Sequence, residues 1–127
     1  MGQQQLLLIV IGLIIIAIAI YMGASLFRQW AINSKRDMII NENNSLASMA
    51  IKYYKTAKEM GGGGNSFKGW SLPSQMLTTA TGTHHLSTIF SDSVIIIGTG
   101  NDVVTGTDTV KVQTTVTASS INTVIIN

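Results

Sequence analysis

The feature that most constrains this chain is an apolar segment close to its N-terminus. Residues 6–27 form a run of 22 residues that contains no charged side chain. As an α-helix, this run would span about 33 Å at 1.5 Å per residue, which matches the roughly 30 Å hydrocarbon core of a bilayer. A chain of 127 residues has little else with which to bury such a helix. We therefore predict a helix that is inserted in a membrane.

Two other interpretations of this segment are less favoured. A cleaved secretory signal should begin with basic residues and have a shorter apolar region of about 7–15 residues. Residues 1–5 carry no basic side chain, and the small residues Ala17 and Ala19 lie inside the apolar run. Myristoylation at Gly2 is not expected, because Leu6 stands where that signal requires Ser or Thr. The segment is better interpreted as a retained membrane helix.

The helix is expected to continue beyond the apolar run, because no proline precedes Pro73 and no glycine lies between Gly23 and Gly61. In residues 28–60 the apolar positions recur at helical spacing and form one face. These positions are Ile39, Leu46, Ala50, Tyr53, Ala57 and Met60. The asparagine-rich stretch 41–44 contains mediocre helix formers and allows a bend. The run of four glycines that starts at Gly61 should end a helix of about 80 Å, from residue 6 to residue 60.

The remainder of the chain has the pattern of a small β domain. Residues 110–117 alternate between Val or Thr and polar residues, which is the period-2 pattern of a half-exposed strand. Phe67 and Trp70 are expected to anchor the connecting loop onto the helix. Further strands are expected at residues 84–90, 94–97 and 123–126, with turns at 98–102 and 119–122. One face of this sheet should pack on the helix, and the other should be rich in threonine.

The predicted fold class is therefore α+β. A long N-terminal α-helix, apolar and then amphipathic, packs against a small C-terminal antiparallel β-sheet head. The helix would occupy residues 1–60, with a membrane or filament-core part at 6–27 and an amphipathic part at 28–60. The β-rich head would occupy residues 61–127. A head of that size is marginal alone, so the amphipathic helix face should supply the other half of its core.

Composition argues against several classes of function. Charged residues make up 11% of the chain, compared with roughly 25% in typical soluble domains. The net charge of +2 contains no basic cluster of the kind that binds nucleic acid. The chain has no cysteine, which excludes disulfides and thiolate-ligated metals. The acidic residues after Glu59 are Asp92, Asp102 and Asp108, of which the last two are expected to form turns.

The few residues that could carry chemistry are better explained by structural roles. His84 and His85 are adjacent on an expected strand and should point to opposite faces, so they cannot easily chelate one ion. The segment Gly98-Thr99-Gly100 lacks the third glycine and the following helix of a dinucleotide-binding motif. The glycosylation sequon at Asn43 lies within the expected helix and is interpreted as fortuitous. We expect no enzyme activity, no metal and no cofactor.

The order of these segments resembles that of the type IV pilins. The resemblance depends on the short polar start Gln3–Gln5, the apolar run 6–27, the long helix and the glycine-rich link to a β-rich head. It implies that a prepilin peptidase cuts after a glycine on the cytoplasmic face of the membrane. In one register the cut falls after Gly2, and Gln3 becomes the N-terminus. In the other register a leader has already been removed, and Met1 is the mature start.

The family usually has a glutamate at the fifth mature position, where it pairs with the N-terminal amine of a neighbouring subunit. Gln5 occupies that position in the second register and Leu7 occupies it in the first. Gln5 could accept a hydrogen bond from the amine, more weakly than a carboxylate would. Arg28, Lys35 and Arg36 would by themselves keep the C-terminal side of the membrane helix in the cytoplasm. A basic leader, as the second register requires, would remove this conflict.

The resemblance implies a structural subunit that polymerises through its N-terminal helix into an extracellular filament. The precursor would reside in the inner (cytoplasmic) membrane, and its partners would be the prepilin peptidase, the pilus assembly machinery and copies of itself. The alternatives are a pseudopilin of a secretion system and a single-pass membrane-anchored protein with a small ligand-binding β domain. The apolar residues expected to pack in the filament core are Leu6, Leu7, Leu8, Ile9, Ile11, Leu13, Ile14, Ile15, Ile16, Ile18 and Ile20.

Overall fold

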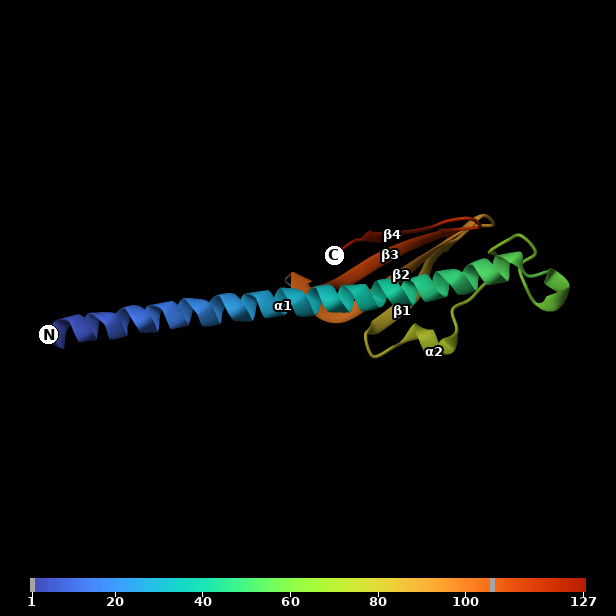
Figure 1. Cartoon of the computed structure of the whole chain (residues 1–127). Helices are drawn as coiled ribbons and strands as arrows, with labels where there is room; N and C mark the ends of the chain where they lie inside the picture. Colours follow the sequence, from blue (N-terminus) through green and yellow to red (C-terminus); the bar gives the residue numbers. More distant parts are fainter. Residues whose placement is uncertain (1, 106) are drawn as a thin grey trace. The chain divides into compact units, whose positions relative to one another are not determined.

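The computed structural model describes residues 2–105 and 107–127 and shows a long N-terminal helix followed by a four-stranded antiparallel sheet (Figure 1). This confirms the α+β fold class. Contacts divide the chain into a unit that ends at Asn33 and a second unit, Ser34–Asn127. The elements are α1 (Gly2–Lys55), the 3₁₀ helix η1 (Lys58–Met60), α2 (Ser74–Leu77), β1 (Gly82–Ile89), β2 (Ser93–Thr105), β3 (Asp108–Thr117) and β4 (Ile121–Ile125).

The helix α1 ends at Lys55, five residues before the predicted end at Met60. The glycine-rich loop folds back over the helix end, where its backbone N–H groups donate to carbonyls in the last turn of α1 and in the two residues that follow Lys55. These bonds are Gly62 N to Ala57 O at 3.0 Å, Gly63 N to Tyr53 O at 2.8 Å, Gly64 N to Thr56 O at 2.9 Å and Asn65 N to Tyr54 O at 2.8 Å. A Cβ atom on Gly63 would overlap the carbonyl oxygen of Ser66, so a larger residue could not make this return.

Because α1 ends at Lys55, the last part of the predicted apolar helix face is wrong. Ala57 and Met60 lie beyond the helix and are exposed, whereas both were expected to be buried on its apolar face. The bend allowed by the asparagines at 41–44 does not occur, since α1 is one continuous helix through them. Instead, Asn43 is completely buried. Its burial removes the sequon from the reach of a glycosylating enzyme on the folded protein.

The four strands form a simple antiparallel meander in the order β1-β2-β3-β4. The turn predicted at residues 98–102 is wrong, because that segment lies within β2. The pairing of β2 with β3 is regular from Ser93 to Thr99 and shifts register between Thr99 and Val103. Glycine within a strand often marks such an irregularity or a close backbone approach, and both occur here.

The inner face of the sheet packs against α1 within the unit Ser34–Asn127. The predicted alternation of residues 110–117 is confirmed: the even-numbered positions are fully buried and the odd-numbered ones are not. The buried residues on the strands include Val94, Ile96, Val110, Val112, Thr114 and Val116. Those on α1 are Ile39, Asn43, Leu46, Ala47 and Ala50. The other face of β3 presents Thr109, Lys111, Gln113, Thr115 and Thr117, in agreement with a threonine-rich face.

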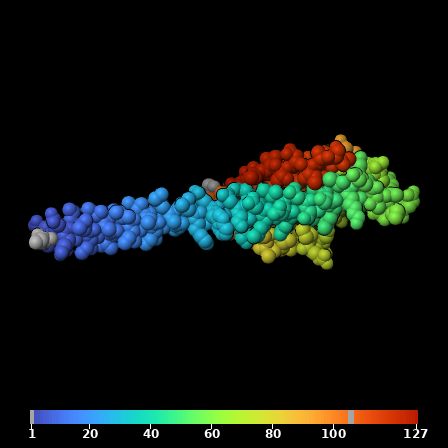
Figure 2. Space-filling view, in the orientation of Figure 1, coloured from blue at the N-terminus to red at the C-terminus, as the bar shows by residue number. Residues whose placement is uncertain are grey.

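The loop after α1 and the edge strand β4 complete the core. Phe67 is fully buried with its ring centroid 4.7 Å from that of Tyr54, and Trp70 is 8% exposed, so both act as the predicted loop anchors. The edge strand β4 lies beside α1 (Figure 2), and the Thr123 hydroxyl donates to Asn44 Oδ1 at 3.4 Å. The core is thus made by one helix face, one sheet face and the loop between them.

Close approach of α1 to β2 requires glycine in the strand. A Cβ atom on Gly98 would lie 2.5 Å from Cγ2 of Ile39 and 2.9 Å from Oδ1 of Asn43, and one on Gly100 would lie 2.7 Å from Cδ1 of Ile39. All of these distances are shorter than van der Waals contact. The predicted turn glycines are therefore spacers between a strand and a helix.

We expect Gly98→Val to lower the free energy of unfolding by about 1–3 kcal/mol through overpacking, although valine favours strands. Thr99→Val, on the opposite face of the same strand, should change the free energy by less than about 0.5 kcal/mol. Urea unfolding of the full chain in a non-ionic detergent, followed by tryptophan fluorescence, measures both. A Gly98→Val variant as stable as Thr99→Val would contradict the packing described.

Candidate functional site

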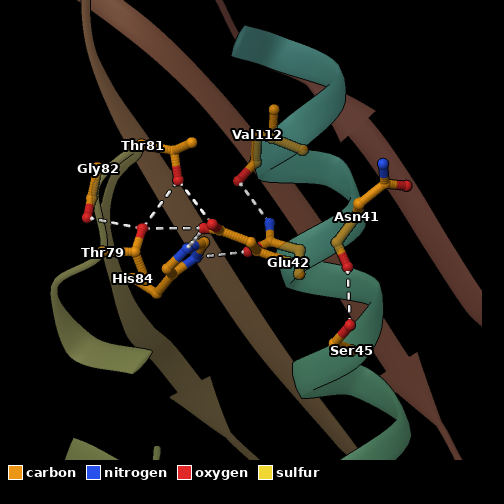
Figure 3. Close-up of polar contacts among 9 residues, drawn as sticks. Asn41, Glu42, Ser45, Thr79, Thr81, Gly82, His84 and Val112 are labelled. Atoms are coloured by element: carbon orange, nitrogen blue, oxygen red, sulfur yellow. Dashed lines mark hydrogen bonds and ion pairs between the residues drawn. The ribbon is translucent and has the colours of Figure 1, made fainter. Parts of the chain in front are cut away.

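The densest group of interacting polar side chains lies between α1 and β1 (Figure 3). Glu42 and Asn43 come from α1, His84 from β1, and Thr79 and Thr81 from the loop that precedes β1. We call these five residues the Glu42–His84 cluster. Nε2 of His84 lies 2.6 Å from Oε2 of Glu42, and Nδ1 of His84 lies 2.8 Å from Oδ1 of Asn43. The cluster thereby connects the helix to the first strand through side chains.

Two threonines provide further hydrogen bonds to the carboxylate of Glu42. The Thr81 hydroxyl donates to Oε1 of Glu42 at 2.7 Å, and the Thr79 hydroxyl lies 3.1 Å from Oε2. The two hydroxyls are also 2.8 Å apart. A carboxylate can accept several hydrogen bonds at once, so these contacts are compatible with the bond from the His84 ring. Glu42 is therefore held by three side chains, all of which come from outside α1.

The Asn43 amide lies between the histidine ring and the backbone of β3. Nδ2 of Asn43 points to the backbone carbonyl of Val112 at 3.4 Å, which leaves Oδ1 facing the ring. Both ring nitrogens of His84 therefore face oxygen atoms. The Asn43 amide thus connects the His84 ring on β1 with the backbone of β3.

Opposing effects act on the acidity of Glu42. Its partial burial disfavours the charged form, but the hydrogen bonds from Thr81, His84 and Thr79 and the positive charge on His84 outweigh that effect. The net result is that the pKa of Glu42 lies below its ordinary value of 4.5. Glu42 is thus an ionised partner whose side chain remains 25% exposed, beside a His84 side chain that is 0% exposed.

The geometry favours a structural tie over a reactive centre. The His84 ring is inaccessible, and each of its nitrogens is already bonded, so neither a substrate nor an ion reaches it. His85 is exposed on the other face of β1, which confirms that the two adjacent histidines point to opposite faces of the strand. Among residues 2–105 and 107–127, no group of three His, Cys, Asp or Glu side chains is placed to hold a metal. Asp102 and Asp108 lie on β2 and β3, outside the cluster.

Sequence analysis missed most of this cluster. Glu42, Thr79 and Thr81 carried no signal, because their partners are about 40 residues away in the chain. Asn43 did carry one: it lies four residues after Ile39 and three before Leu46, on the buried stripe of α1. A polar residue at such a position requires a buried hydrogen-bond partner. The lone buried histidine on the facing strand was the available match.

The processing and assembly residues lie on the first part of α1. Gly2, Gln3 and Gln5 are helical and exposed, and Met1 lies outside the described residues. The candidate filament-core side chains are all exposed, from 44% at Ile11 to 68% at Leu8. This part of α1 is long and apolar enough to cross a membrane.

Comparison of the chain with protein-family models, with curated proteins and with solved structures gave no match.

The lowered pKa of Glu42 predicts how the free energy of unfolding depends on pH. The ionised carboxyl stabilises the fold above about pH 4.5, and this stabilisation is lost as the pH falls through the lower, folded-state pKa. The free energy of unfolding should therefore decrease between pH 6 and pH 3 more steeply in the wild type than in Glu42→Gln. Glu59→Gln, which removes an exposed carboxylate on η1, should follow the wild type. Parallel curves for the wild type and Glu42→Gln would contradict the role of this carboxylate.

The amide of Asn43 can be tested separately. Asn43→Ala leaves Nδ1 of the buried His84 ring without its partner and removes one contact to the Val112 carbonyl, which should cost about 1–3 kcal/mol of unfolding free energy. Asn41→Ala is the matched control, because its side chain is exposed and only its backbone carbonyl accepts a bond, from Ser45. Chemical unfolding of both variants in detergent gives the difference. Equal stability would show that Asn43 is dispensable to the core.

Proposed function

We propose that this chain is the structural subunit of a type IV pilus-like filament and polymerises through residues 6–27. The observation that carries the proposal is the exposure of every candidate filament-core side chain on a helix that continues without interruption into the core of the unit Ser34–Asn127. A segment that is apolar on all sides needs an apolar environment on all sides. A bilayer supplies that environment to a membrane-bound subunit, and neighbouring subunits supply it in a filament.

The free energy of apolar burial is consistent with moving residues 6–27 from the bilayer to a helix-packed filament core. Burial of apolar surface contributes roughly 25 cal/mol per Å², so residues 6–27 cannot remain in water. Helices that leave lipid gain little from the hydrophobic effect and associate by close packing, which small residues promote. A Cβ atom on Gly12 or Gly23 would meet nothing within 4 Å in the single chain, so both positions are open to a neighbouring helix.

The N-terminal residues have roles in this proposal. A prepilin peptidase processes the precursor in the cytoplasmic membrane, either after Gly2 or at a leader that precedes Met1. In the register that starts at Met1, Gln5 replaces the usual glutamate and accepts a hydrogen bond from the N-terminal amine of a neighbour; in the register that starts at Gln3, Leu7 occupies that position. The assembly machinery then transfers the subunit into an extracellular filament. The core of the unit Ser34–Asn127 remains intact throughout, because its own part of α1 packs on the sheet.

The first test is the state of the wild-type chain in the cells that produce it. Filaments sheared from the surface should contain this chain as the repeating subunit, and N-terminal sequencing should start at Gln3, or at Met1 below an encoded leader. A chain found only as a membrane monomer would refute the proposal in favour of a membrane-anchored binding protein. A start near Ile20 would indicate a cleaved secretory signal.

A substitution in the filament core gives the second test. Ile15→Lys places a charge in the apolar segment at a cost of about 2.5–3.5 kcal/mol at a helix centre in a membrane. We expect at least a ten-fold loss of subunit from the sheared fraction, relative to the subunit that remains in membranes. Ser119→Lys adds the same charge to an exposed turn between β3 and β4 and should leave filament yield unchanged. Normal filaments from Ile15→Lys would contradict a core role for residues 6–27.

A further inference from the structure

Arg28 is the only charged side chain in residues 1–33. All six acidic residues of the chain lie at Asp37 or beyond, so the unit that ends at Asn33 contains no carboxylate side chain. Arg28 is exposed and forms no hydrogen bond or ion pair with any residue that the structure describes. A cation therefore follows the apolar segment without an anion from its own unit.

A shallow groove lies on the face of α1 that carries Arg28. Tyr21, Ala24, Ser25 and Arg28 line it, and their spacing of three, four and seven positions places them on one side of the helix. Ala24 and Ser25 are small and leave open the space between the two long side chains. Because helical side chains incline toward the N-terminus, Arg28 covers the turn that contains Ser25. We call these four residues the Tyr21–Arg28 face.

The Ser25 hydroxyl is a second unused donor on this face. Further along α1, the hydroxyls of Ser45 and Ser48 donate to the carbonyls four residues earlier, at 3.1 and 3.0 Å. Ser25 is exposed and forms no such bond within the described part of the chain. The face thus offers a guanidinium and a hydroxyl to an external acceptor.

The length of the apolar run places the Tyr21–Arg28 face at the edge of the bilayer. With residue 6 at one boundary, a hydrocarbon core of roughly 30 Å ends about 20 residues later, close to Leu26. Arg28 then reaches the headgroup layer, which adds about 5–7 Å on each side of the core. Phe27 and Trp30, on another side of the helix, are exposed with ring centroids 6.1 Å apart, and aromatic rings favour this interface. Arg28 is therefore at the depth of the lipid phosphates.

We propose that the Tyr21–Arg28 face binds the phosphodiester group of a membrane phospholipid. The inference rests on the membrane-bound subunit of the proposed function. The planar guanidinium of Arg28 pairs with two phosphate oxygens, and the Ser25 hydroxyl donates to one of them. The Tyr21 ring, about 10 Å deeper, packs on the upper part of the lipid chains. Both leaflets contain phosphodiesters, so the contact forms on whichever side of the membrane carries the head.

Charge complementarity selects a lipid over a second copy of the chain. A phosphodiester carries a single negative charge, which matches the single positive charge of this face, and the boundary of the hydrocarbon core strengthens their attraction. A copy that lies parallel in the membrane has no acidic residue in its first 36 positions and offers no carboxylate at this depth. The bound lipid holds the helix at one depth and in one rotation until the subunit is assembled.

Lipid retention by the purified full chain tests the contact. The chain is kept in a non-ionic detergent with phosphatidylglycerol, and native mass spectrometry measures the fraction of chains that retain a lipid. We expect one retained lipid per wild-type chain and at least a five-fold lower fraction for Arg28→Gln. A galactolipid with the same acyl chains and no phosphate should be retained at least five-fold less than phosphatidylglycerol.

A matched variant separates the groove from the charge alone. Arg28→Gln combined with Gln29→Arg moves the cation by about 1.5 Å along the helix and by about 100° around it. This double variant should retain as little lipid as Arg28→Gln, because the cation no longer lies beside Ser25. Ser25→Ala should lower retention about two-fold, and Ser45→Ala, whose hydroxyl already has an acceptor, should not change it.

The outcomes separate this contact from the filament itself. Equal retention of the two lipids, or a double variant that retains as much lipid as the wild type, would overturn the contact. Dimers that depend on Arg28 and hold no lipid would identify a second copy as its partner and would also overturn it. Sheared wild-type filaments from a chain that retains no lipid would overturn the contact alone. A chain that retains the lipid and forms no filament would support the contact and overturn the filament.

Discussion

The unit Ser34–Asn127 depends on the burial of one stripe of α1 against the inner face of the sheet. Ile39, Leu46, Ala47 and Ala50 provide the helix side of that contact, and alternate residues of β2 and β3 provide the other. Neither side is a complete core alone, since a four-stranded meander has one apolar face to cover. Gly98 and Gly100 permit the close approach, because any side chain at those positions would overlap Ile39. The loop anchored by Phe67 closes the open end of the layer.

A polar tie lies within this apolar contact. His84, Asn43 and Glu42 are bonded to one another and to the backbone of β3, so the buried polar atoms of the tie have partners. Apolar contacts tolerate sliding, whereas hydrogen bonds of defined geometry permit one position. The cluster therefore fixes the register of α1 against β1 and β3. The His84 side chain is inaccessible, so the cluster acts as an internal tie between these elements.

The apolar surface of residues 6–27 is compatible with two environments. Residues 6–27 are exposed and apolar, which suits lipid and a helix-packed core equally. In the proposed filament this segment supplies the contact between subunits.

The sequence by itself determined the features that depend on local pattern. The uncharged run 6–27, the alternation of residues 110–117 and the glycines after Met60 were interpretable, because each pattern reflects one helix, one strand or one turn. Tertiary structure decided the rest. The loop N–H groups return to the carbonyls of Tyr53 and Tyr54 and end α1 at Lys55, although the apolar spacing continues to Met60.

The same distinction applies to the strand glycines and to the polar cluster. Gly98-Thr99-Gly100 has the composition of a turn, but pairing with β1 and β3 makes it part of a strand, and the proximity of Ile39 requires glycine on its inner face. Glu42 and His84 are separated by 42 positions, so no local pattern joins them. The sequence determines which side chains lie on each face of a helix or strand. Which side chains meet is decided by packing, because that depends on the distance and register between elements that are remote in the chain.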